Sequence, residues 1–257
     1  MAVAFGVGLG LVAATATPGS ALAASPHDEA RALLQHAVFL EGQAEEQREL
    51  SVLIYDAELD KAEAQDTQAA LRLRAAQEKV KAGLRDEARA QVEQGLGLAG
   101  QADDAREIAA LIYGAELDKA DAQHEQARLR RGLAQEKFQE AGFIKEARAA
   151  GLRLEGHVLL WTSHVASDQS TFDDRLAASA SDRAQLLRQT ARVVRRSSPD
   201  AALLAAASLM EQQADVDRQE AQRLNRAARQ FSRESMTAGS KADRRFQNAE
   251  RLDPGGS

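Results

Sequence analysis

The chain has 257 residues, with 33 Lys and Arg against 39 Asp and Glu, so its net charge is −6 at pH 7. It contains no cysteine, which excludes disulfides, thiolate metal sites and a cysteine-linked lipid anchor. Aromatic residues make up only 4% of the chain while alanine is abundant, so we expect many shallow helix contacts along a long body rather than a core of large rings.

The first 23 residues have the pattern of a secretory signal peptide. An apolar run from Val3 to Ala14 is followed by Pro18-Gly19-Ser20 and by Ala21-Leu22-Ala23, which matches a small-residue cleavage site. The run carries no Lys or Arg ahead of it, which departs from the usual signal, and an apolar helix retained as an anchor is the alternative. No later apolar run is long enough to span a bilayer. We therefore expect an exported protein, periplasmic or extracellular, with no stable membrane span after cleavage.

The next stretch is an internal repeat with a period of 58 residues. The block Leu53 to Gln65 returns as Leu111 to Gln123 with only two of thirteen positions changed. The match extends over repeat units at about 30–87 and 88–146, and a partial third unit begins at Glu146. Such a pattern is typical of a repeat array in which each unit completes the core of the next.

Helix is the expected secondary structure throughout. No proline occurs between Pro26 and Pro199, and Ala, Leu, Arg, Gln and Glu dominate. We expect a helical repeat region at 24–165, a C-terminal helical hairpin at 166–236 and a flexible tail at 237–257. Within the repeat region, helix ends are expected at Gly42, Gly83, Gly100 and Gly142. Ends are also expected at Asp66-Thr67 and His124-Glu125, where no glycine occurs and a continuous helix is the alternative. The predicted fold is all-α, an array of antiparallel helix hairpins followed by a C-terminal helical pair.

The repeated block has two apolar arcs on a helical wheel. One arc contains Leu53, Ile54, Ala57 and Ala64, and the other contains Tyr55, Leu59 and Ala62. A helix with two apolar arcs has a neighbour on each side, whereas an amphipathic surface helix needs only one. The pattern therefore predicts stacked helices.

The motifs that suggest chemistry have simpler explanations. Gly95 to Gly100 matches the G-x-G-x-x-G fingerprint, but a helical stretch rather than a strand precedes it, so nucleotide binding is rejected. The five histidines are too dispersed to hold a metal ion. Ser163, His164 and Asp168 are the residue types of a hydrolytic triad but lie nearly consecutively, without a nucleophile elbow. We therefore predict no catalytic, cofactor-binding or metal-binding residues.

Three aromatic residues and two charged strips are candidates for binding. Tyr55 and Tyr113 recur in the repeat, and Trp161 lies in the richest apolar run, so packing is the first interpretation and partner binding the second. The acidic strip of Asp56, Asp60 and Glu63 is interpreted as a solvated face, because a straight helix presents too few oxygens for calcium. The basic stripe at Arg223, Arg226, Arg229 and Arg233 could bind an anionic envelope polymer. Nucleic acid is not expected, since we expect the protein to be exported and no aromatic residues are interleaved.

The repeat resembles the tetratricopeptide (TPR) family. Ala82-Gly83 followed by Ala88 looks like the inter-helix turn of that family, and Ala88 to Ala122 spans its 34-residue period. The sequence departs from the family at Leu59 and Leu117, where a turn glycine belongs. The resemblance implies a curved stack of helix pairs that holds another protein or peptide.

The sequence favours a non-catalytic helical-repeat protein that mediates protein binding or scaffolding in the cell envelope. The alternative is a coiled-coil structural protein that associates with itself, because Leu50, Ile54, Ala57, Ala64, Leu71 and Ala75 fit a heptad template that Lys61 and Gln68 interrupt.

Overall fold

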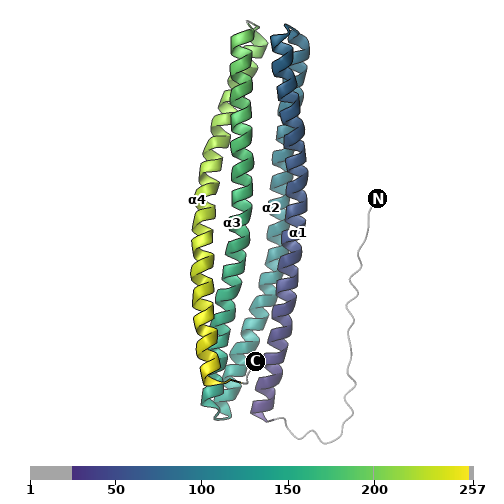
Figure 1. Cartoon of the computed structure of the whole chain (residues 1–257). Coiled ribbons are helices and arrows are strands. Elements are labelled where there is room, and N and C mark those ends of the chain that lie inside the picture. The colour runs from purple at the N-terminus through teal and green to yellow at the C-terminus, as the bar shows by residue number, and fades with distance from the viewer. Residues whose placement is uncertain (1–24, 199, 255–257) are drawn as a thin grey trace, which may run out of the picture.

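The computed structural model describes residues 25–198 and 200–254, which form four long α-helices and contain no strand. Helix α1 spans Pro26–Lys81, α2 spans Arg85–Glu140, α3 spans Ile144–Ser197 and α4 spans Ala201–Leu252. The helices alternate in direction and pack chiefly as two antiparallel hairpins, α1 with α2 and α3 with α4 (Figure 1). The prediction of an all-α fold built from antiparallel helix hairpins is confirmed. The signal sequence expected at residues 1–23 lies outside the described residues.

Each repeat unit is one long helix with its following turn. A shift of 58 residues maps the buried positions of α1 onto those of α2, for example Ala30 onto Ala88, Tyr55 onto Tyr113 and Val80 onto Phe138. Apart from Gly83 and Gly142, helices α1 and α2 continue through all four places where a helix end was expected. The ends expected at Gly42 and Gly100 are therefore wrong, and at Asp66-Thr67 and His124-Glu125 the alternative of a continuous helix is the one observed. A glycine inside a helix costs only about 1 kcal/mol, which packing along 56 residues outweighs. A TPR-like arrangement of short helix pairs is not shown.

Two of the four turns that were predicted at glycine do form, at Gly83 and Gly142. Gly83 and Gly142 have φ of 75° and 77°, the left-handed conformation that glycine adopts without strain. Leu84 N donates to Lys79 O and Phe143 N donates to Phe138 O, which closes each helix in the same six-residue pattern. The turn between α3 and α4 is made differently, with the side chain of Asp200 accepting from Leu203 N.

Alanine at seven-residue intervals explains why the helices pair closely. Buried alanines recur at this spacing in every helix, as in Ala177, Ala184 and Ala191 of α3 or Ala207, Ala214, Ala221 and Ala228 of α4. In α1 and α2 the spacing shifts by four residues at one place, from Ser51 to Tyr55 and from Ala109 to Tyr113. Such a four-residue insertion changes the local supercoil, and here a tyrosine fills the wider gap.

Two predicted boundaries do not appear as breaks in the chain. Helix α3 runs continuously through residue 166, where the C-terminal hairpin was expected to begin. Helix α4 continues to Leu252, so most of the tail expected at 237–257 is helical, with Ala238, Ala242 and Ala249 buried. The seven-residue alanine spacing continues into this segment, and that packing explains the order.

The two hairpins contact each other mainly through α3, which touches both α1 and α2, whereas α4 contacts α2 only lightly. Apolar cores lie at the two ends and in the middle of the bundle. The larger end core, near the α1–α2 and α3–α4 turns, includes Leu73, Val92, Leu187 and Met210. The start of α1, the α2–α3 turn and the end of α4 lie together at the opposite end (Figure 1). A 56-residue helix is about 84 Å long, so the fold is a rod.

Candidate functional site

The two tyrosines predicted as binding candidates lie together in the middle of the bundle. The ring centroids of Tyr55 and Tyr113 are 5.5 Å apart, and Phe172 of α3 contacts both at 4.1 and 5.0 Å. Tyr55 is 4% exposed and Tyr113 is 6% exposed. Burial raises the pKa of both phenols. This geometry favours the packing interpretation, because a partner could reach these rings only if the hairpins separated.

Trp161, the third candidate, lies apart from the tyrosines on α3. Its ring stacks on His124 of α2 with centroids 4.8 Å apart and planes 12° from parallel. Its Nε1 donates a hydrogen bond to Asp121 Oδ1 at 2.7 Å. Burial lowers the pKa of His124, so the imidazole is neutral at pH 7 and stacks as an uncharged ring. Trp161 therefore ties the two hairpins together.

Arginine–carboxylate pairs also join the two hairpins. Arg48 of α1 pairs with Asp168 of α3 and with Glu45 of its own helix. Arg183 of α3 pairs with Asp103 of α2 at 2.5 Å and with the buried Asp217 of α4 at 2.8 Å. Burial opposes the charge of Arg183, yet its two carboxylate partners raise the pKa of the guanidinium. These pairs form an ionic seam beside the apolar cores that also join the hairpins.

The acidic strip on α1 is part of this seam and is not simply a solvated face. Arg175 of α3 binds Asp56, Asp60 and Glu63 at 2.8, 2.9 and 2.8 Å. Successive acidic residues on one helical face thus receive a single guanidinium from another helix. No group of three or more potential ligands could hold a metal ion within residues 25–198 and 200–254.

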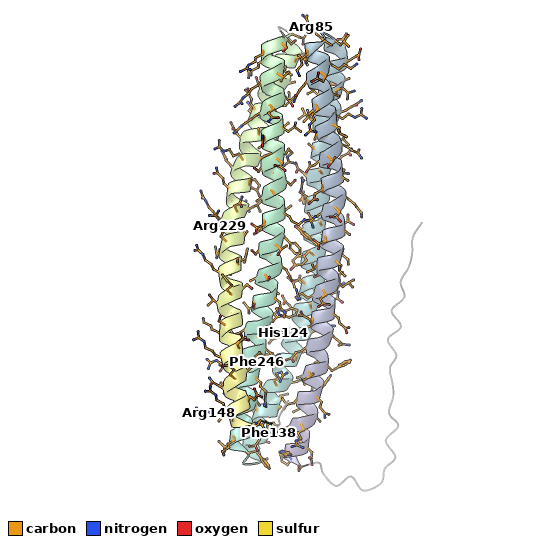
Figure 2. All side chains as sticks on the ribbon, in the orientation of Figure 1. Arg85, His124, Phe138, Arg148, Arg229 and Phe246 are labelled. Atoms are coloured by element: carbon orange, nitrogen blue, oxygen red, sulfur yellow. The ribbon has the colours of Figure 1, made fainter. Side chains whose placement is uncertain are left out.

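A second charged cluster surrounds His157 on α3. Arg131 of α2 donates to Glu41 of α1 through two bonds of 2.6 Å and lies 3.0 Å from His157 Nε2. Burial lowers the pKa of His157 to about 4, and the charge of Arg131 adds to this effect while Glu41 opposes it. His157 also contacts Phe246 of α4 with centroids 5.0 Å apart, and Figure 2 shows Phe246 and His124 in the lower half of the bundle. His157 is therefore a neutral packing residue at pH 7.

The residue types of a hydrolytic triad are held by different partners. Ser163 donates to Ser235 O of α4 at 2.9 Å, and His164 Nδ1 lies 3.1 Å from Glu45 of α1. Asp168 pairs with Arg48. Each group is engaged in joining helices, and no hydrogen bond links any two of the three.

The outer face of the α1/α2 hairpin is a feature that the packing of the chain does not explain. Leu53 lies two residues before Tyr55, which is 200° around the helix and so nearly opposite the core. It is 65% exposed, and its repeat equivalent Leu111 is 69% exposed. We use the term outer face for the exposed sides of α1 and α2, which carry three equivalent pairs of exposed apolar residues: Leu50 and Ile108, Leu53 and Leu111, and Leu71 and Leu129. Leu71 also lines a groove between α1 and α3.

The sequence predicted that this side of the helix is apolar, but the prediction of what covers it was wrong. The apolar arc containing Leu53 and Ala57 was expected to pack against another helix of the same chain. In the structure only the arc of Tyr55, Leu59 and Ala62 does so, while Leu53, Ala57 and Ala64 remain exposed. The heptad template drawn through Leu50, Ala57 and Leu71 likewise follows the exposed side.

A groove of about 780 Å³ runs between α1 and α3 and is lined by residues such as Asp66, Leu71, Ser179 and Leu187. Its acidic and basic groups already pair across the seam, as when Arg106 binds both Asp66 and Ser179. The groove is therefore a gap between diverging hairpins whose polar groups are satisfied by one another.

Comparisons of the chain with protein-family models, with curated proteins and with solved structures found no match. Across residues 25–198 and 200–254, none of the helices combines the length and the hydropathy needed to cross a membrane. Among the surfaces described above, the outer face of the α1/α2 hairpin is the best candidate for a functional surface, because its apolar residues are exposed at equivalent places in both repeats.

Proposed function

We propose that this protein is a non-catalytic binding or scaffolding protein of the cell envelope that acts through the outer face of its α1/α2 hairpin. The observation that carries the proposal is that Leu53 and Leu111 are conspicuously exposed yet identical in the two repeats. Tyr55 and Tyr113 are repeated because they fill the core, but no packing within the chain requires the exposed leucines. Exposed apolar side chains that recur at equivalent places are the kind of surface that a contact with another protein would cover.

The shape of the molecule supports a scaffolding role. A rod with a helix length of about 84 Å presents a long surface with few hollows, which suits binding along its side rather than enclosure of a small molecule. The potential catalytic groups Ser163, His164 and Asp168 are each held by another helix, which is consistent with a non-catalytic protein.

The proposal is tested by site-specific photo-crosslinking in the cell envelope of a producing cell. A photoreactive phenylalanine analogue replaces Leu53, and the matched control replaces Leu209 of α4, which is similarly exposed at 60%. We expect a defined protein adduct from position 53 and none from position 209. Absence of an adduct at both Leu53 and Leu111 would contradict a binding role for the outer face.

The anionic envelope polymer expected at the Arg-rich C-terminal helix remains a prediction. Arg226, Arg229 and Arg233 are exposed on α4, and Figure 2 shows Arg229 on the edge of the bundle away from α1 and α2. This surface is separate from the outer face of the α1/α2 hairpin.

A further inference from the structure

A hollow between α3 and α4 gathers positive charge on the side of the bundle. It has a volume of about 470 Å³ and lies in the part of the α3/α4 hairpin near its turn, which is the upper half in Figure 1. Its lining consists of Arg188, Arg192 and Arg218, two alanines, and otherwise glutamine, asparagine and serine. None of the described residues that line it carries a carboxylate. We call this feature the arginine hollow.

The arginine hollow follows from the alanine spacing of the two helices. Ala184 of α3 and Ala221 of α4 both line it, and they are buried, at 4% and 5% exposure. Alanine lets two helices approach but fills little volume, so a shallow space remains over such a pair. Arg188 and Arg192 follow Ala184 by four and eight residues and therefore lie on the same side of α3. The sequence thus surrounds a floor of alanine with long polar side chains.

Two of the three arginines have no acidic partner. Arg188 pairs with Asp215 of α4. Arg192 and Arg218 form no ion pair with any residue in the ranges 25–198 and 200–254. A guanidinium has five N–H donors, so Arg188 also keeps donors that Asp215 does not use. The arginine hollow therefore lies beside two uncompensated positive charges and a third, partly engaged guanidinium.

The nearest carboxylates are engaged elsewhere. They line a separate hollow of about 320 Å³ that shares the three arginines and includes Glu211 and Asp215. Glu211 binds Arg195 at 2.8 Å, and Asp215 binds Arg188. These two acids hold neighbouring arginines in place and do not neutralise the remaining pair.

The three arginines form a row along the hairpin. Arg192 lies four residues from Arg188 on α3, which is about 6 Å along the helix axis. Asp215, which Arg188 binds across the hairpin, lies three residues or about 4.5 Å from Arg218 on α4. Because the two helices are antiparallel, these steps add, and the row extends about 10 Å from Arg192 to Arg218.

We propose that the arginine hollow binds a small molecule that carries a diphosphate group. Arg192 and Arg218 bind the phosphate oxygens from the two ends of the row, and Arg188, held by Asp215, binds between them. The outer face of the α1/α2 hairpin takes no part, so this inference goes beyond the proposed function and is independent of it.

A diphosphate matches both the donors and the spread of the charge. Every polar side chain of the lining can donate a hydrogen bond, and the outer oxygens of a diphosphate accept them. A guanidinium donates two parallel bonds to one phosphate. A single carboxylate would occupy one arginine and leave the other uncompensated, whereas two linked phosphates distribute negative charge along the row. The volume lies within the range of about 300 to 1,000 Å³ of small-molecule sites, which leaves room for an organic group.

The first test is isothermal titration calorimetry of the purified protein with inorganic diphosphate, at low ionic strength and without divalent cations. We expect saturable binding of one diphosphate per chain, with an affinity about tenfold or more above that of inorganic phosphate. Absence of saturable binding up to about 5 mM, or equal affinity for the two ions, would overturn the inference.

A matched pair of variants separates a site from general electrostatic attraction. Arg192→Ala with Arg218→Ala should lower the affinity for diphosphate by about tenfold or more. The control Arg226→Ala with Arg229→Ala removes the same charge from α4 outside the hollow, and Figure 2 shows Arg229 on the outer edge of the bundle. It should bind as the wild-type protein does. All four arginines are exposed, so both variants should keep the helical circular dichroism spectrum. Equal losses of affinity in the two variants would refute a site at the hollow.

A sedimentation assay distinguishes two sources of the diphosphate group. The protein is mixed with vesicles of a neutral phospholipid that contain a polyprenyl diphosphate. Sedimentation that the Arg192→Ala/Arg218→Ala variant loses assigns the group to a lipid headgroup. Binding of free diphosphate without sedimentation assigns it to a dissolved compound. Sedimentation that the variant retains would contradict the arginine hollow as the binding site.

Discussion

Gly95 offers a direct test of how closely α1 and α2 are packed. A Cβ atom at this position would lie 2.9 Å from Leu73 Cγ and 3.3 Å from the backbone oxygen of Ala69. Leu73 is only 2% exposed and belongs to the larger end core, so it has little room to move. Gly97, two residues further on, has nothing within 4 Å of the equivalent atom. Substituting Gly95 and Gly97 by alanine therefore separates the effect of helix propensity from the effect of packing, at two positions within a single helical turn.

The expected energies have opposite signs at the two positions. Replacing a helical glycine by alanine stabilises by about 0.5 to 1 kcal/mol where the side chain meets open space. Overpacking a closely packed core costs about 1 to 3 kcal/mol. We therefore expect Gly97→Ala to raise the free energy of unfolding, whereas Gly95→Ala should be neutral or destabilising by about 2 kcal/mol.

The measurement is urea unfolding of both variants and the wild-type protein, followed by circular dichroism. Because the gain in helix propensity is common to both variants, their difference should equal the overpacking cost of about 1 to 3 kcal/mol, seen as a lower midpoint for Gly95→Ala at a similar slope. If Gly95→Ala were as stable as Gly97→Ala, the close approach of α1 to Gly95 would be refuted.

Two further predictions concern buried polar groups. The hydroxyl of Tyr113 is buried and makes no hydrogen bond to any described residue, so Tyr113→Phe should stabilise by about 1 kcal/mol in thermal unfolding. Tyr55→Phe serves as the comparison, and equal effects of the two substitutions would contradict this reasoning. The pKa of His157 is about 4 in the folded protein, below its ordinary value of 6.5, so the unfolded chain binds its proton first as the pH falls. Stability should therefore be greatest above pH 6.5 and decline by about 1 to 2 kcal/mol by pH 5, allowing for a ring that is 30% exposed. His157→Gln should flatten this part of the pH profile, and an unchanged slope would show that other groups cause it.

The sequence predicted the fold class and two of the turns because these depend on local chemistry. Gly83 and Gly142 end helices since a left-handed residue is required there, and the composition between Pro26 and Pro199 permits little but helix. Gly42 and Gly100 carry the same local signal, yet their positions face open space within continuous helices. What distinguishes the two kinds of glycine is the seven-residue spacing of buried alanine, which continues past Gly42 and stops at Gly83.

The candidate surface and the ionic seam could not be predicted, because they depend on contacts between residues that are far apart in the sequence. Arg175 lies more than a hundred residues from the acidic strip, so nothing local indicated that Asp56 and Glu63 share one guanidinium. The two apolar arcs were visible in the sequence, but periodicity alone does not tell which arc the same chain covers. Phe172 of α3 packs against Tyr55 and not against Leu53, and this contact between distant residues decides that Tyr55 is buried while Leu53 is exposed.

Because each repeat unit is a single helix, the number of units decides where the chain ends. With four helices, the start of α1 and the end of α4 lie at the same end of the rod (Figure 1). Loss or gain of one 58-residue unit would move the C-terminus to the opposite end, about 84 Å away, whereas a change of two units would leave it in place. The consequence of duplicating this unit therefore depends on whether the number of helices is even or odd. An even number keeps both termini at one end of the rod, whereas an odd number places them at opposite ends, so that the rod can connect two places.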